Sequence, residues 1–244
     1  NFVLVSDHDE RPVRSEILKR HRRQQKNTSR AKKDRVVGAV KIPEEEKEQL
    51  LADTILASMM WPKISSGRWK ELAPTHAVLQ QIRGGCIPKD QLDAIVRIKT
   101  KYRFFHWHQA FPEILSSGGF DIVLGNPPYL DSEFLKRHAP YQRVAMSSLY
   151  VSTRGNWDIY IPFTELGVRL LRKNGYHAFV TPNKILGSDY AKALQRDVLF
   201  TNRLREIHDF SALSLFPGAR IAVVIVVTEK EKPSDQDSIL FCRY

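Results

Sequence analysis

The chain has 244 residues, a mean hydropathy of −0.36 and a formal net charge of +11 at pH 7. This length supports one domain, or two small ones, with a buried core. No apolar run approaches the roughly 18 residues that a transmembrane helix needs, and the first ten residues lack a signal-peptide pattern. The excess of positive charge favours a polyanionic partner, with nucleic acid the first candidate.

The two cysteines, Cys86 and Cys242, lie far apart in the sequence and match no metal-binding or disulfide spacing. This pattern favours a reducing, intracellular setting, and the lack of a long apolar run favours no membrane partner. The first residue is Asn1 rather than Met. We therefore expect the chain to be a piece of a longer protein.

The first third of the chain separates into a basic segment and a helical one. Residues 1–43 are crowded with Lys and Arg and poor in large apolar side chains, as in a basic arm along DNA or a solvated linker. Pro43 followed by three glutamates predicts a helix start, and apolar residues recur at helical spacing until Pro62. A second helix is predicted over residues 89–100. Residues 44–100 are therefore expected to form a helical insertion.

From residue 101 onward, predicted strands alternate with predicted helices. The expected strands are residues 102–107, 120–124 (a buried strand), 176–180, 204–210 and 220–228. The expected helices are residues 158–172, with a glycine cap at Gly175, and residues 188–200, with Ser188 as the cap. This alternation predicts an α/β fold with a parallel or mostly parallel sheet and helices on its faces.

Asn126, Pro127, Pro128 and Tyr129 follow the second of these strands and Gly125. Ligands of open α/β sheets bind beyond the carboxyl ends of the strands, although a rigid turn that only closes a strand is the alternative. The Asn126 side-chain oxygen and the Pro127 carbonyl can accept both hydrogens of a conjugated amino group. The two prolines stiffen the backbone, and Tyr129 offers a ring for stacking an extruded base. This chemistry requires no metal.

Residues 102–129 resemble the catalytic segment of large adenine-specific DNA methyltransferases of type II restriction-modification systems, notably enzymes with fused activities. The resemblance rests on the Phe-Pro-Glu turn, Gly-Gly-Phe-Asp and Asn-Pro-Pro-Tyr. It extends to about residue 228 through Asn156-Trp157-Asp158 and Thr181-Pro182-Asn183. It implies a Rossmann-like class I methyltransferase sheet, incomplete at its N-terminal side, within a catalytic domain over residues 101–244.

The resemblance also implies a cofactor, a partner and a cellular setting. The cofactor is S-adenosyl-L-methionine, the partner is double-stranded DNA with a flipped adenine, and the setting is the prokaryotic cytoplasm. Fused nuclease and target-recognition domains would lie outside this chain. Phe216, just before the last predicted strand, is a candidate second wall of the base pocket, and a core or turn phenylalanine is the alternative.

One feature of the family has no counterpart in the sequence. The family binds its cofactor through a glycine-rich turn after a strand, and neither Gly84-Gly85 nor Gly118-Gly119 follows a predicted strand and opens a helix. The cofactor-binding residues are therefore unassigned: the turn precedes residue 1 in the parent protein, or the chain is inactive. His106 and His108 lack Cys or carboxylate partners at ligand spacing, so no metal site is expected.

The function predicted is S-adenosylmethionine-dependent methylation of the exocyclic amino group of adenine in DNA, within a restriction-modification enzyme. Two alternatives remain. The same loop chemistry serves a methyltransferase acting on protein glutamine or RNA. The chain is also compatible with a DNA-binding module of a larger enzyme that is inactive alone.

Overall fold

The computed structural model describes residues 38–62, 67–213, 215–216 and 221–244. Most of the basic segment predicted at residues 1–43 lies outside these ranges. The chain divides into two compact units, residues 1–106 and 107–244. Within the described ranges, no helix is long and apolar enough to span a membrane.

The first unit is mainly helical in its described part. Its elements are β1 (Ala39–Lys41), α2 (Glu44–Met60), α3 (Arg68–Glu71), α4 (His76–Arg83), β2 (Cys86–Pro88) and α5 (Lys89–Tyr102). The two predicted helices are both present. Helix α2 has three glutamates in its first turn, where they oppose the positive end of the helix dipole. The core includes Ala57, Ile82, Ile87 and Ile95, all of them fully buried.

The strand predicted at residues 102–107 is wrong. Helix α5 continues to Tyr102, Arg103 ends it in a left-handed conformation (φ 50°), and α6 (Trp107–Ala110) follows. Aromatic side chains in this stretch suggested a strand, but Tyr102 and Phe104 pack against the helical core of the first unit. His106 is buried, with Nε2 2.8 Å from Asp53 Oδ1, and Lys99 Nζ donates to the other Asp53 oxygen at 2.7 Å.

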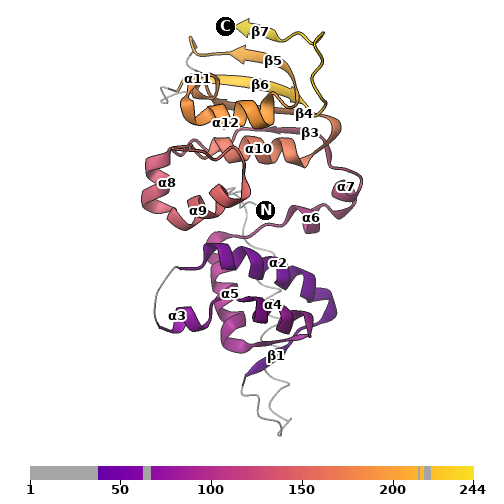
Figure 1. The fold of residues 1–244 in the computed structure, drawn as a ribbon, viewed down its shortest axis with the longest axis vertical. Coiled ribbons are helices and arrows are strands. Elements are labelled where there is room, and N and C mark those ends of the chain that lie inside the picture. Colours follow the sequence, from indigo (N-terminus) through magenta and orange to yellow (C-terminus); the bar gives the residue numbers. More distant parts are fainter. Residues whose placement is uncertain (1–37, 63–66, 214, 217–220) are drawn as a thin grey trace. The chain divides into compact units, whose positions relative to one another are not determined.

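The second unit contains a five-stranded sheet in the order β3-β4-β6-β5-β7 (Figure 1). The strands are β3 (Phe120–Gly125), β4 (Leu171–Pro182), β5 (Arg203–Asp209), β6 (Val223–Glu229) and β7 (Leu240–Arg243). The described α-helices are α6, α7 (Pro112–Ser116), α8 (Ser132–His138), α9 (Pro140–Leu149), α10 (Tyr160–Leu170), α11 (Lys184–Gly187) and α12 (Lys192–Leu194). Strand β6 is antiparallel to β4 and β5, and the other pairs are parallel. The predicted α/β class is confirmed, but the sheet is mixed: four of its five described strands share a direction, and the reversed β6 makes two of the four strand pairs antiparallel.

Two predicted element ends differ from the structure. Helix α10 ends at Leu170, because Leu171 already pairs with Phe120 of β3. Gly175 lies inside β4 and does not cap the helix. A Cβ there would lie 2.8 Å from the Phe120 carbonyl oxygen, so glycine is needed for the close approach of β3. The helical run after Ser188 continues to Leu199 through α12, with a 3₁₀ turn before it and a π turn after it.

Strand β3 was expected to be buried, but it is an edge strand. Among the described residues it pairs with β4 alone, and Ile122 and Leu124 are 58% and 71% exposed. Both pair with β4 residues on the face opposite to α10. In the described part of the chain, β3 therefore presents an apolar sheet edge, and the predicted incompleteness of the sheet stays a prediction.

His177 of β4 lies on the face that α10 covers. A Cβ at Gly167 of α10 would lie 2.6 Å from the His177 ring, which shows how closely helix and strand pack. His177 is 1% exposed, and neither ring nitrogen has a hydrogen-bond partner among the described residues. Burial lowers the pKa of His177 to about 4. The side chain is therefore neutral in the folded protein at pH 7.

This burial predicts acid sensitivity between about pH 6.5 and pH 4. In that window the unfolded chain binds a proton at His177 that the folded chain excludes, so the free energy of unfolding falls as the pH falls. Between pH 7 and pH 4.5 we expect His177 to account for a loss of roughly 2 kcal/mol. The measurement is urea unfolding of His177→Leu and the unchanged chain at both pH values. The variant should lose less stability on acidification than the unchanged chain. Equal losses for His177→Leu and the unchanged chain would contradict the assignment.

Candidate active site

The Asn-Pro-Pro-Tyr loop (residues 126–129) directly follows β3. Strands β4 and β5 run in the same direction as β3, so their carboxyl ends lie at the same edge of the sheet. Asn183 follows β4 at this edge, where its side chain donates to Ser211 Oγ beyond β5 at 3.1 Å. The loop thus occupies the ligand-binding edge of an α/β sheet.

The four loop residues differ in burial. Asn126 and Pro128 are exposed, Pro127 is buried and Tyr129 is half-buried. The Tyr129 hydroxyl donates to the Val180 carbonyl of β4 at 3.0 Å. Burial raises the pKa of the Tyr129 phenol, so it remains a neutral donor. The loop therefore presents an amide side chain to solvent while its tyrosine is fastened to the neighbouring strand.

The chain just beyond the loop is held by the segment that precedes α10. Asp158 Oδ1 accepts the Ser132 backbone N–H at 3.0 Å, and the Ile159 N–H donates to the Leu130 carbonyl at 2.9 Å. The sequence assigned no role to Asp158. Asp158 belongs to the Asn156-Trp157-Asp158 motif, which is visible in the sequence. The sequence around it does not show which residue the Asp158 carboxylate contacts.

The segment that carries Asp158 is itself anchored by buried groups. Trp157 is 1% exposed and lies under the Arg143 guanidinium, 4.3 Å from the ring centre. Arg143 also donates to the Trp157 carbonyl at 3.1 Å.

Glu165 of α10 is 1% exposed. Its carboxylate accepts the backbone N–H groups of Val151 and Ser152 and pairs with Arg169. The segment that carries Asp158 is therefore held against α9 and α10 by these contacts.

Phe216 lies in the connection between β5 and β6 and is half-buried. Strand β5 ends and β6 begins at the same edge of the sheet as the Asn-Pro-Pro-Tyr loop. Ala222, just before β6, lies beside the end of β4, since its carbonyl accepts the Asn183 N–H at 2.9 Å. Phe216 therefore belongs to a connection between two strand ends at this edge, and its stacking role stays a prediction.

The described residues do not form a glycine-rich cofactor turn. Gly84 and Gly85 lie between α4 and β2 in the first unit. Gly118 and Gly119 precede β3 at the opposite edge from the loop, where Gly119 packs against the backbone after α10. Neither pair links a strand to a following helix at the carboxyl edge. The cofactor-binding residues remain unassigned.

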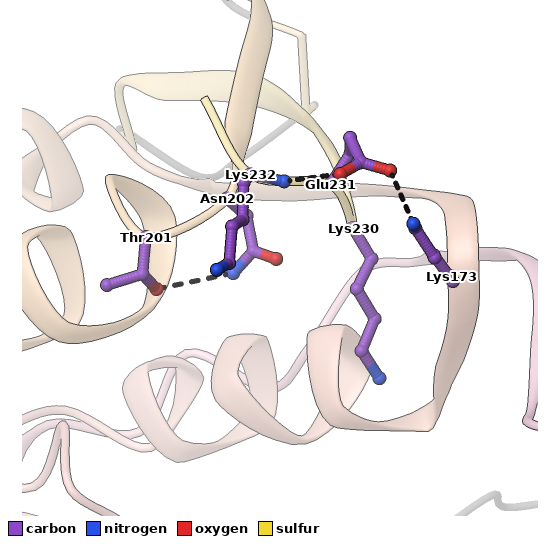
Figure 2. A pocket seen from close by; sticks show the side chains of 6 residues that line it. All are labelled: Lys173, Thr201, Asn202, Lys230, Glu231 and Lys232. Atoms are coloured by element: carbon purple, nitrogen blue, oxygen red, sulfur yellow. Dashed lines mark hydrogen bonds and ion pairs between the residues drawn. The ribbon is translucent and has the colours of Figure 1, made fainter. Parts of the chain in front are cut away.

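A polar pocket of about 400 Å³ lies at the other end of the strands (Figure 2). Its lining residues are Lys173, Thr201, Asn202, Lys230, Glu231 and Lys232. They precede β5, follow β6 or lie near the start of β4, which places the pocket at the edge opposite to the Asn-Pro-Pro-Tyr loop. Lys230 Nζ donates to the carbonyls of Arg169 and Leu171 at the end of α10. This pocket is therefore separate from the candidate active site.

An α/β sheet in which four of the five described strands share a direction, with a proline-stiffened loop at its carboxyl edge, is typical of Rossmann-like proteins. The Eco57I restriction-modification methylase family matches residues 63–216, and the chain belongs to this family.

Two curated relatives give the extent of the similarity. The chain is 27% identical over 146 residues to a putative type II restriction enzyme and methyltransferase, RM.MjaORFECS2P, of Methanocaldococcus jannaschii, covering 57% of the chain and 11% of the relative. It is 31% identical over 111 residues to the type II methyltransferase M.TthHB8I of Thermus thermophilus, covering 44% and 25%. The chain thus matches only a small part of each relative.

Solved structures with a similar arrangement include the type IIL restriction-modification enzyme MmeI in complex with DNA. The TM-score is 0.43 at 16% identity, over 61% of this chain and 22% of that one. A putative class I S-adenosylmethionine-dependent methyltransferase from Listeria monocytogenes gives a TM-score of 0.39 at 15% identity, over 81% and 64%.

Proposed function

We propose that this chain carries the target-base half of an S-adenosylmethionine-dependent DNA methyltransferase that modifies the exocyclic amino group of adenine. One observation carries the proposal: Asn126 is exposed at the carboxyl end of β3, between a strand and the buried Pro127. Membership of a restriction-modification methylase family supports methyl transfer to DNA. The Asn at the first loop position resembles the adenine-specific branch of such enzymes more than the cytosine-specific branch.

The loop residues would act by aligning the amino nitrogen. Its lone pair is delocalised into the adenine ring, which makes the nitrogen a poor nucleophile. The Asn126 side-chain oxygen and the Pro127 carbonyl would accept its two hydrogens, which favours a tetrahedral nitrogen with a localised lone pair. Pro127 and Pro128 restrict the backbone, so the acceptors are in place before the base arrives.

The base must leave the duplex to reach this loop, and aromatic side chains would stabilise it there. Tyr129 would stack against the extruded adenine, with its hydroxyl held by Val180, and Phe216 would contact the other side. The net charge of +11 favours the approach of the DNA phosphates. Double-stranded DNA is therefore the proposed partner.

The proposed cofactor, S-adenosylmethionine, would supply the methyl group. The described residues lack the glycine-rich turn that the family uses, so the role proposed for this chain is confined to binding and orienting the amino group. A fused nuclease or a target-recognition domain would lie in other parts of the parent protein, and the prokaryotic cytoplasm remains the proposed location.

The test compares substrate classes in the protein that carries this chain. Methyl-labelled S-adenosylmethionine would be incubated with duplex DNA, structured RNA and glutamine-containing peptides, and the products would be separated as nucleosides or amino acids. We expect the label in N6-methyladenine from duplex DNA. Label in methylcytosine, RNA or glutamine would reject the proposed substrate.

A further inference from the structure

Two hydrogen bonds hold the C-terminal side of the Asn-Pro-Pro-Tyr loop, and only one of them comes from the loop itself. Tyr129 contacts β4 through its own hydroxyl. The other fastening is the Asp158 carboxylate, which comes from the segment before α10 and binds the chain three residues beyond Tyr129. We infer that Asp158 is a positioning residue for the Asn-Pro-Pro-Tyr loop and that Tyr190 and Tyr160 hold Asp158 in turn. This inference rests on the proposed function.

The contacts between the two segments are reciprocal. Ser132 donates its N–H to Asp158 Oδ1 at 3.0 Å, and Leu130 accepts the Ile159 N–H at 2.9 Å. Ser132 is therefore hydrogen-bonded to residue 158, and Leu130 is hydrogen-bonded to residue 159. Asp131, between them, caps α8 by accepting the Phe134 N–H at 2.7 Å. The chain that leaves Tyr129 thus has little freedom to move.

Two tyrosine hydroxyl groups, hydrogen-bonded in series, orient Asp158: Tyr190 contacts Asp158, and Tyr160 contacts Tyr190. Tyr190 donates its single hydrogen to Asp158 Oδ2 at 2.7 Å. The contact of 3.0 Å between the Tyr160 and Tyr190 hydroxyls must therefore have Tyr160 as the donor. Burial raises the pKa of both phenols, which keeps them protonated as donors. Asp158 Oδ1 is left available for Ser132.

Two of the residues that hold Asp158 in place are buried. Tyr160 is 0% exposed in the first turn of α10, and Trp157 just before Asp158 is 1% exposed. Hydrogen bonds to a carboxylate are also stronger than those between neutral groups. Displacing a reacting group by about 1 Å can cost on the order of 100-fold in rate. Loss of the Asp158 contact should therefore reduce turnover even though Asp158 need not touch the base.

The test uses four variants in the protein that carries this chain. Asp158→Ala removes the carboxylate, Asp158→Asn keeps one oxygen for the Ser132 N–H, and Tyr190→Phe removes the donor to Asp158. Asp189→Asn is the matched control, since Asp189 is next to Tyr190 in sequence, is exposed and pairs with Lys192. The measurements are kcat per folded molecule, KM for DNA, and the fluorescence of 2-aminopurine at the target position.

We expect Asp158→Ala to lower kcat by about 10- to 100-fold while KM for DNA changes by less than about threefold. Tyr190→Phe should give a smaller fall in kcat, and Asp158→Asn should recover to within about threefold of the unchanged protein. The 2-aminopurine signal should change in Asp158→Ala, because Tyr129 is displaced from the base. Asp189→Asn should match the unchanged protein in every measurement.

The outcomes separate the two proposals. Full activity of Asn126→Ala would reject the proposed function. An inactive Asn126→Ala together with unchanged kcat in Asp158→Ala would reject the positioning role alone. An Asp158→Asn protein as impaired as Asp158→Ala would also reject it, because positioning needs only the retained oxygen. If Asp158→Ala fails to fold, an unchanged kcat in Tyr190→Phe overturns the inference, and a reduced kcat with unchanged KM supports it.

Discussion

Replacement of Asn126 by Ala is expected to lower the rate of methyl transfer by about 100-fold or more. The variant lacks the side-chain oxygen that accepts one hydrogen of the amino group, and the Pro127 carbonyl alone leaves the nitrogen lone pair delocalised. Asn126 is exposed and no hydrogen bond within the described ranges engages its side chain. The fold should therefore tolerate the change. Single-turnover methylation of duplex DNA with saturating S-adenosylmethionine measures the effect.

DNA binding provides the companion measurement for Asn126→Ala. The dissociation constant for duplex DNA should change little, because phosphate contacts supply most of the affinity. Gln236→Ala is the control: it removes an exposed amide between β6 and β7, at the opposite edge of the sheet. Its methylation rate should stay near that of the unchanged protein. A fully active Asn126→Ala protein would reject the assigned role of the loop.

Replacement of Gly119 by Ala is expected to destabilise the second unit by about 2 to 4 kcal/mol. The backbone at Gly119 has φ 124°, a region that residues with a Cβ rarely adopt. The added Cβ would lie 2.7 Å from the Leu171 carbonyl carbon and 2.8 Å from the Arg172 nitrogen. These backbone atoms cannot easily move, because Leu171 pairs with Phe120 at the start of β3.

Urea unfolding followed by circular dichroism measures this loss in the 244-residue chain. Gly187→Ala is the control, because nothing lies within 4 Å of a Cβ at that position and its φ is not positive. That variant should be within about 0.5 kcal/mol of the unchanged chain. Equal stability of the two variants would show that the backbone near Leu171 adapts. Because β3 carries the Asn-Pro-Pro-Tyr loop, Gly119→Ala should also lower methylation activity.

Local sequence patterns determined the elements that carry the site. The apolar residues of 120–124 are a strand, and the Asn-Pro-Pro-Tyr loop follows it directly. Helices α2 and α5 begin at the predicted residues, where Pro43 and Pro88 precede them. Such features depend on side-chain periodicity and on the fixed φ of proline, which act over a few residues. The loop was identified for the same reason: its chemistry lies in four consecutive residues.

The tertiary structure decided what depends on distant residues. Sequence patterning did not show that β6 runs antiparallel between β4 and β5, because a strand's direction is set by its partners. The strand predicted at residues 102–107 was wrong, because Tyr102 and Phe104 pack against the helical core of the first unit. The contact between Asp158 and Ser132 joins residues 26 positions apart, and Tyr190 reaches Asp158 across 32. The sequence by itself determined the local elements and suggested the chemistry proposed for residues 126–129. Only folding decided which groups hold that loop in place, because hydrogen bonds between distant segments leave no local pattern.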